Sequence, residues 1–261
     1  MSKGSRRKDT RGEKKRKEVR KTRQTGFIIL AGVIVAVIAI SAIVFIHGSS
    51  LSSTSTTSAF GFSNPSNKPV IIYVNQGNAV VNRGNFSTLL AFAKSHHFNT
   101  IFFQIYRSGQ LLFNEGDLQY FVEAAHLDNL SVFYSLYFTN PSEQIPNSVY
   151  NLGENGISLD MSTLPAAAQS NLLATLKLDL KNGTTAVTST NLTTTLKPDL
   201  LILETYDFQA DQSYIHSGVI GSVEPLTIAS SQEYQRELQF SISNGSGVMV
   251  FDYYGLSKAG Y

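Results

Sequence analysis

Val70-Ile-Ile-Tyr-Val74 opens the stretch that decides the fold, because a short, mostly β-branched apolar run of this kind predicts a strand. A helical pattern over 86–97 and an apolar run at 99–105 follow it. A second helical pattern over 117–127 and a third apolar run at 130–137 repeat the alternation. This β-α-β-α-β order requires parallel strands joined by crossover helices.

The same rhythm continues to the end of the chain. Further strands are expected at 156–160, 184–190, 200–205, 218–223 and 248–252, and further helices at 165–180 and 232–242. Eight such strands predict an α/β fold, a (β/α)8 TIM-like barrel. The barrel would be compact, because residues 68–261 are fewer than the roughly 250 that these barrels usually have. We expect the crossover helices after the third, fifth and sixth strands to be reduced to turns. An open α/β sheet is the alternative.

A different kind of segment precedes this domain. Residues 26–46 are 21 uncharged, almost wholly apolar positions, about 30 Å long as a helix, which predicts a transmembrane helix. Residues 1–25 hold 12 of the 21 Lys and Arg, whereas residues 47–261 hold 9 basic and 16 acidic residues. The positive-inside rule then predicts a single-pass cell-membrane protein with a cytoplasmic N-terminus and an extracytoplasmic C-terminal domain. A cleaved secretory signal is the alternative.

The chain therefore divides into four predicted parts. They are a basic cytoplasmic tail at 1–25, a transmembrane helix at 26–46, a Ser/Thr-rich linker at 47–67 and an exported domain at 68–261. The tail lies against the membrane, so contact with anionic lipid is expected rather than binding of nucleic acid. The sequence has no cysteine, which excludes disulfides and thiolate chemistry.

Polar and aromatic residues gather where the predicted strands end, which is where function lies in a barrel of this kind. The carboxylates among them are Asp160, Glu204, Asp207, Glu224 and Asp252, and the other residues are Asn75, Gln104, Tyr106, Arg107, Tyr137, Tyr206, Tyr253 and Tyr254. Paired carboxylates and flat rings are what a site that cleaves or binds sugars requires.

We assign candidate catalytic roles to three of these carboxylates, Asp160, Glu204 and Asp252. Glu204 and Asp252 each end an apolar strand, where a carboxylate is costly unless it is paired or faces a site. Asp160 has an alternative role as a cap of the helix that begins near Pro165. The candidate substrate-binding residues are Asn75, Gln104, Tyr106, Arg107, Tyr137, Tyr206, Asp207, Glu224 and Tyr253.

No cofactor or metal is predicted. Neither a G-x-G-x-x-G after the first strand nor a G-x-x-x-x-G-K-[ST] motif occurs, so both nucleotide-binding fingerprints are missing. The histidines lack an H-x-x-x-H or comparable ligand spacing. A G-x-S-x-G nucleophile elbow is also missing, which removes support for serine-hydrolase chemistry.

Three segments resemble the glycoside-hydrolase-like TIM barrels: Gly156-Ile-Ser-Leu-Asp160, Lys197-Pro-Asp-Leu-Leu-Ile-Leu-Glu-Thr-Tyr-Asp207 and Gly247-Val-Met-Val-Phe-Asp-Tyr-Tyr-Gly255. The resemblance implies hydrolysis or binding of polysaccharide or cell-surface glycan, with Asp160 and Glu204 as rim carboxylates beside Tyr206 and Asp252. The fourth predicted strand lacks the Asn-Glu pair that many retaining enzymes have there, and the chain lacks the Asp-x-x-Asp-x-Asp-x-Glu run of chitinase-like barrels and has no tryptophan.

The leading hypothesis is a membrane-anchored, extracytoplasmic barrel that cleaves or binds glycan with its rim carboxylates. A non-catalytic glycan- or protein-binding envelope protein is the second hypothesis. A structural envelope protein, whose barrel only spaces or anchors other components, is the third. The sequence leaves the oligomeric state open.

Overall fold

The computed structural model describes residues 68–76, 81–150, 152–180, 183–190, 196–205, 207–224 and 230–259. The predicted tail at 1–25, transmembrane helix at 26–46 and linker at 47–67 lie outside these residues, and so does Tyr206. Of the helices in the described part of the chain, none combines the length and the apolar character that crossing a membrane requires.

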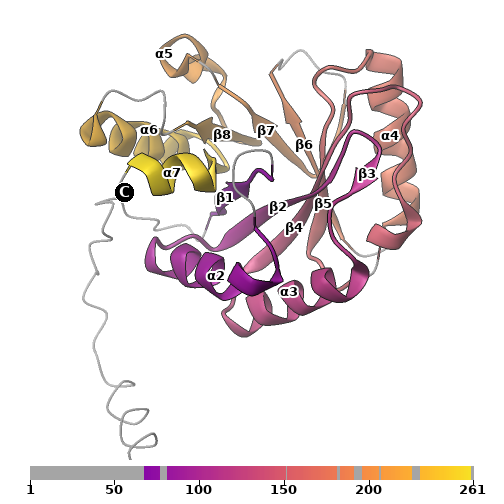
Figure 1. The fold of residues 1–261 in the computed structure, drawn as a ribbon. Coiled ribbons are helices and arrows are strands. Elements are labelled where there is room, and N and C mark those ends of the chain that lie inside the picture. The colour runs from indigo at the N-terminus through magenta and orange to yellow at the C-terminus, as the bar shows by residue number, and fades with distance from the viewer. Residues whose placement is uncertain are drawn as a thin grey trace, which may run out of the picture. The chain divides into compact units, whose positions relative to one another are not determined.

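The described strands form one sheet that closes into a barrel (Figure 1). Its eight parallel strands are β1 (Val70–Val74), β2 (Thr100–Arg107), β4 (Ser131–Tyr137), β5 (Gly156–Asp160), β6 (Thr184–Ser189), β7 (Leu200–Leu203), β8 (Val219–Val223) and β9 (Gly247–Phe251). They follow one another around the ring in chain order, and β1 pairs with both β2 and β9. The predicted TIM-like barrel is confirmed, and the alternative of an open sheet is wrong.

A two-residue strand, β3 (Gln110–Leu111), adds an antiparallel pairing to the end of β2 that the sequence did not predict. The helices of the domain are α2 (Phe86–Ser95), α3 (Glu115–Leu127), α4 (Ala166–Asp179), α5 (Phe208–Asp211), α6 (Ser231–Asn244) and α7 (Tyr253–Ala259). Short 3-10 turns lie at η2 (Arg83–Asn85), η3 (Asn147–Val149) and η4 (Gln212–Tyr214).

The crossovers shorten as predicted where the structure describes them. Between β4 and β5 the described residues contain only the turn η3, and between β7 and β8 they contain the four-residue α5 and the turn η4. The longer crossover helices α2, α3, α4 and α6 cover the outer face of the barrel (Figure 1). A domain smaller than the usual barrel therefore keeps its eight strands and loses helix length.

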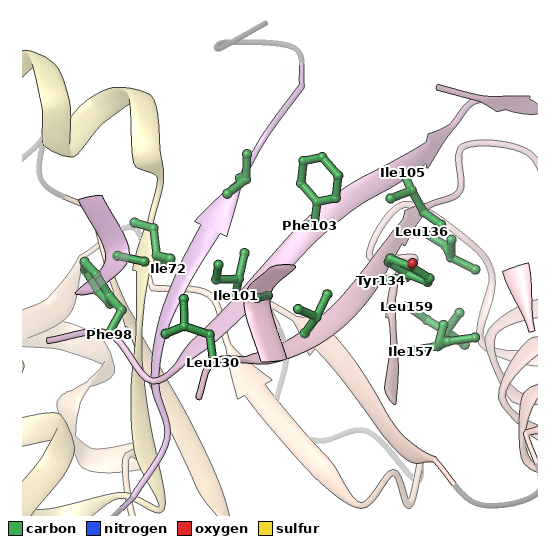
Figure 2. Close-up of a cluster of buried hydrophobic side chains, with 14 of the residues drawn as sticks. Ile72, Phe98, Ile101, Phe103, Ile105, Leu130, Tyr134, Leu136, Ile157 and Leu159 are labelled. Carbon is green, nitrogen blue, oxygen red and sulfur yellow. The ribbon is translucent and has the colours of Figure 1, made fainter. Parts of the chain in front are cut away.

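Alternation along each strand sends side chains to two apolar layers. On β1, Ile71 and Tyr73 belong to the cluster inside the barrel, whereas Val70, Ile72 and Val74 belong to the layer between strands and helices. Figure 2 shows part of this outer layer, built from neighbouring strands, with Ile72, Ile101, Phe103, Tyr134, Leu136, Ile157 and Leu159. The inner layer consists of Ile71, Tyr73, Phe102, Phe133, Ala186, Ile202, Ile220 and Met249.

Local chemistry fixes where the long helices begin. The Asn114 side chain accepts a hydrogen bond from the backbone N–H of Asp117 and caps α3, and the Ser230 hydroxyl accepts one from the N–H of Glu233 and caps α6. Such side chains replace hydrogen bonds that the first turn of a helix lacks. These two caps stabilise the first turns of α3 and α6.

Candidate functional site

A pocket of about 300 Å³ opens at the carboxyl ends of the parallel strands. It is lined by Tyr73, Asn75, Gln104, Arg107, Tyr137, Asp160, Ser162, Thr163, Glu204 and Phe251. Six of the twelve residues predicted for the site are in this lining: Asn75, Gln104, Arg107, Tyr137, Asp160 and Glu204. Ring closure brings them together from five different strands.

Asp160 ends β5, and its backbone pairs with Tyr137 on one side and Thr188 on the other. The Ser162 hydroxyl donates to the Asp160 carboxylate at 3.4 Å. Burial, followed by the negative charge of Glu204, raises the pKa of Asp160 to about 7. The alternative role as a helix cap is wrong, since Pro165 precedes α4 and that helix has no side-chain cap.

Glu204 follows β7, half-buried, and its backbone N–H donates to the Ser189 carbonyl at 3.0 Å. Only β6 separates its strand from that of Asp160. The charge of Glu204 acts on its surroundings, because it contributes to the raised pKa values of both Asp160 and Glu224. Within the described residues, the ion pairs of Lys and Arg with carboxylates do not include Asp160.

Asp252 is buried immediately before α7, and its carboxylate accepts a hydrogen bond from the backbone N–H of Gly255 at 2.8 Å. This is the geometry of a helix cap. Asp252 is not in the lining of the pocket, yet its negative charge helps raise the pKa values of Tyr73 and Glu224. The structure therefore gives it a structural contact beside the site, and its catalytic role stays a prediction.

A β-bulge decides which of two predicted residues at the end of β2 enters the pocket. The register between β2 and β4 shifts between Gln104 and Tyr106, so that Ile105 has no partner in β4. Ile105 and Tyr106 both lie in the outer layer, and Arg107 then lines the pocket. Strict alternation would have put Tyr106 inside and Arg107 outside. Tyr106 instead donates its hydroxyl to Glu143 at 3.1 Å, away from the site.

The other predicted residues lie near the rim without lining the pocket. The Tyr253 ring packs edge-on against Phe92 with centroids 5.0 Å apart, and Asp207 caps α5 by accepting from the N–H of Ala210. Glu224 is half-buried, and burial followed by the charges of Glu204 and Asp252 raises its pKa.

Sequence reasoning missed Tyr73, which lies at the floor of the pocket. Its ring stacks on Phe251 with centroids 4.7 Å apart, and its hydroxyl accepts hydrogen bonds from Ser135 and from the Gln104 amide. Burial, followed by the charge of Asp160, raises the pKa of Tyr73 far above its usual value, so the phenol stays protonated. Tyr73 is two residues before Asn75, which the sequence did assign to the site. Side chains two residues apart on a strand point to the same face, and this alternation is the signal that could have identified Tyr73.

A second depression lies on the outside of the barrel, between α2 and α3. It has a volume of about 670 Å³ and is lined mainly by apolar atoms of residues such as Leu90, Ala91 and Leu127. Its two charged side chains, Lys94 and Asp128, pair with one another at 2.6 Å. This surface lacks the convergent polar groups of the pocket at the strand ends.

The pocket holds two carboxyl groups that suit acid–base chemistry. Among the described residues, no group of three or more His, Asp and Glu side chains is arranged to hold a metal ion. Asp160 keeps its proton up to near-neutral pH, whereas Glu204 supplies negative charge in the same pocket. One carboxyl group as a proton donor and a second as a carboxylate is the pairing used to cleave glycosidic bonds.

Among known proteins, solved structures share the fold of this chain, whereas sequence comparisons find no match. No family model matches the chain, and no curated protein sequence matches it. A chitinase from Bacteroides thetaiotaomicron superposes with a TM-score of 0.51 at 14% identity, over 72% of this chain and 90% of that one. The GH18 chitinase ChiB from the chitin utilization locus of Flavobacterium johnsoniae gives 0.51 at 11% identity, over 72% and 88%.

A glycoside hydrolase family 5 protein from Bacteroides vulgatus gives a TM-score of 0.50 at 11% identity, over 69% of this chain and 57% of that one. Identities this low establish a shared architecture and carry no residue-by-residue assignment. The exported domain predicted from the sequence is thus similar in fold to the TIM-like barrels of glycoside hydrolases.

Proposed function

We propose that this protein is a glycoside hydrolase that acts on polysaccharide or cell-surface glycan at the pocket formed by the strand ends. The observation that carries the proposal is that Asp160 and Glu204 line one pocket, with the pKa of Asp160 raised to about 7. Fold likeness to glycoside hydrolases supports it.

In the proposed mechanism, Asp160 is the general acid. It donates its proton to the glycosidic oxygen as the bond to the leaving sugar breaks, and Glu204, as the carboxylate, attacks the sugar or activates a water molecule. The environment separates the two roles, because burial and the charge of Glu204 keep Asp160 protonated.

Aromatic side chains supply the surface on which a sugar ring would rest. Tyr137 lines the pocket beside Asp160, its in-register neighbour on the next strand, and the stacked pair of Tyr73 and Phe251 lies on another side. Flat rings pack well against the apolar faces of pyranoses.

A binding protein without catalysis is the second candidate for the same pocket. The sequence feature in its favour is the absence of both carboxylate motifs that mark the retaining and chitinase-like barrels. Such a protein would hold a glycan in this pocket and leave it intact.

We also propose that residues 26–46 anchor the chain in the cell membrane, with the barrel on the extracytoplasmic side. The 12 basic residues of 1–25 and the apolar run support this topology. Protease added to intact cells should digest the barrel and leave the N-terminal tail protected. Digestion of the tail alone, or a barrel released by salt washing, would contradict the anchor.

The catalytic proposal is tested with the full-length protein in detergent and a panel of neutral and acidic polysaccharides. Release of reducing ends should occur for at least one of them and should fall about 10²- to 10⁴-fold in Asp160→Asn and Glu204→Gln. Glu123→Gln, an isosteric change on the exposed face of α3, serves as the control and should keep full activity. Retained activity in both pocket variants refutes the assignment, and binding without turnover supports the second candidate.

A further inference from the structure

We propose that the pocket is selective for acidic glycans, and that Arg107 binds a carboxylate or sulfate group of the sugar. The inference rests on the proposed function in one respect only, that the pocket accepts a glycan. It adds the substrate class and the residue that selects it.

The backbone of β2 is deformed at the point that directs the Arg107 side chain. Without the register shift beyond Gln104, the alternation of β2 would direct Tyr106 to the pocket and Arg107 outward. With it, an exposed guanidinium lies in the lining of the pocket. A bulge beside a site commonly re-aims one side chain, and here that side chain is a cation.

Arg107 lies in a row of side chains that crosses three neighbouring strands. Arg107 is in register with Tyr137, and Tyr137 is in register with Asp160 on the next strand. Neighbouring strands are about 4.8 Å apart, so Arg107 and Asp160 lie about 10 Å apart at backbone level with the Tyr137 ring between them. A single sugar residue resting on Tyr137 would place a substituent at the guanidinium while its glycosidic bond faces Asp160.

Arg107 contacts the aromatic ring of Tyr137. Its guanidinium carbon is 5.7 Å from the centroid of the Tyr137 ring, within the range of a cation–π contact. In the described part of the chain, the ion pairs between basic and acidic side chains do not include Arg107. A planar guanidinium presents a fork of N–H donors that matches a carboxylate or a sulfate.

Charged side chains are unevenly distributed around the mouth of the barrel. In the ring of eight parallel strands, β2 with Arg107 is opposite β7, which Glu204 follows. Glu224 follows β8, the strand next to β7, whereas Asp252 follows β9, which is two strands from both β2 and β7. Arg107 is therefore on the side of the mouth away from Glu204 and Glu224, which favours a ligand with its anionic group at β2.

The test compares four full-length proteins: wild type, Arg107→Gln, Arg107→Lys and the control Arg236→Gln on the outer helix α6. Binding is measured with short oligosaccharides at about 0.15 M salt: galacturonate, sulfated dextran, neutral dextran and glucosamine oligomers. The basic tail at 1–25 attracts polyanions in every variant, so the readout is the difference between variants.

Arg107→Gln should weaken binding of the galacturonate or the sulfated oligomer at least about tenfold and leave binding of the neutral oligomer unchanged. Arg107→Lys should bind the acidic oligomers with intermediate affinity, because it keeps the positive charge and loses the forked N–H donors of the guanidinium. Arg236→Gln should match the wild type. The acidic oligomer that responds tells whether the group is a carboxylate or a sulfate. The inference is overturned if Arg107→Gln binds the acidic oligomers as tightly as the wild type does. It is also overturned if the wild type prefers the neutral or glucosamine oligomers.

The two proposals fail in different ways. Cleavage that depends on Asp160 but shows no selectivity change in Arg107→Gln refutes the acidic substrate and leaves the hydrolase intact. Binding of acidic oligomers that depends on Arg107, without cleavage of any glycan, refutes the proposed hydrolase activity and leaves the proposed ligand class intact.

Discussion

Asp160 and Glu204 line one pocket from β5 and the end of β7, and the charge of Glu204 adds to burial in raising the pKa of Asp160 to about 7. Two carboxyl groups in one low-dielectric pocket resist ionising together. This electrostatic link between residues far apart in the sequence is accessible to direct measurement.

Glu204→Gln should therefore lower the pKa of Asp160, because one negative charge disappears while burial remains. Titration of the Asp160 carboxyl carbon by NMR measures the change in pKa without relying on the activity of the variant. Glu123→Gln should leave the titration as in the wild type. An unchanged midpoint in Glu204→Gln would show that burial alone acts on Asp160.

Tyr73→Phe should destabilise the domain by about 1–3 kcal/mol. The phenol oxygen accepts hydrogen bonds from Ser135 and Gln104 inside the barrel, and its removal leaves two buried donors without an acceptor. Urea unfolding measures the effect. Tyr120→Phe, on the exposed outer face of α3, is the matched control and should change little. An equal loss of unfolding free energy in both variants would contradict the buried hydrogen bonds as the cause.

Glu237 on α6 should make stability depend on pH. It is 6% exposed, and burial, followed by the charge of Glu233, raises its pKa to about 7 from an ordinary value of 4.5. The folded state then holds this proton more tightly than the unfolded state does, so the stabilisation is present at low pH and is lost as pH rises from about 4.5 to about 7.

Replacing Glu237 with Gln removes that loss. The variant should be more stable than the wild type by about 1–2 kcal/mol at pH 8 and should differ little at pH 5. Urea unfolding at the two pH values measures this, with Glu123→Gln as the exposed control. A benefit of equal size at both pH values would contradict the linkage to the proton.

Gly156→Ala and Gly116→Ala should have effects of opposite sign. A methyl group at Gly156, at the start of β5, would press into the Thr184 carbonyl and the Phe133 ring, and overpacking of this kind costs about 1–3 kcal/mol or more. Gly116 lies in α3 with room for a methyl group, so alanine there should add up to about 1 kcal/mol. Thermal unfolding compares the two variants, and a tolerated Gly156→Ala would mean that β5 and β6 shift apart easily.

The barrel was predictable because its evidence is local. Most of the parallel strands, such as β1, are apolar runs bounded by polar residues, and the long helices show apolar faces of their own. The carboxyl ends of the strands then identify the side of the barrel on which polar residues converge, and this placed Asp160 and Glu204 together.

The details that escaped prediction depend on pairing between distant segments. The shift that separates Tyr106 from Arg107 exists only in the register of β2 against β4, so the sequence alone assigned both residues to the site. The contact of Asp252 depends on α7, a helix that the sequence pattern did not show. Tyr73 looked like part of an apolar strand because its hydroxyl meets Ser135 and Gln104 only inside the closed ring.

The small strand β3 has a consequence for association between molecules. β1 pairs with β2 only as far as Phe103, whereas β2 continues to Arg107, so its last residues extend beyond their neighbour. β3 pairs with Tyr106 and Arg107, and the Leu112 N–H donates to the Ile105 carbonyl. The backbone groups that an aggregating strand from another molecule would use are thereby occupied, and the overhang that carries Arg107 is protected from edge-to-edge stacking.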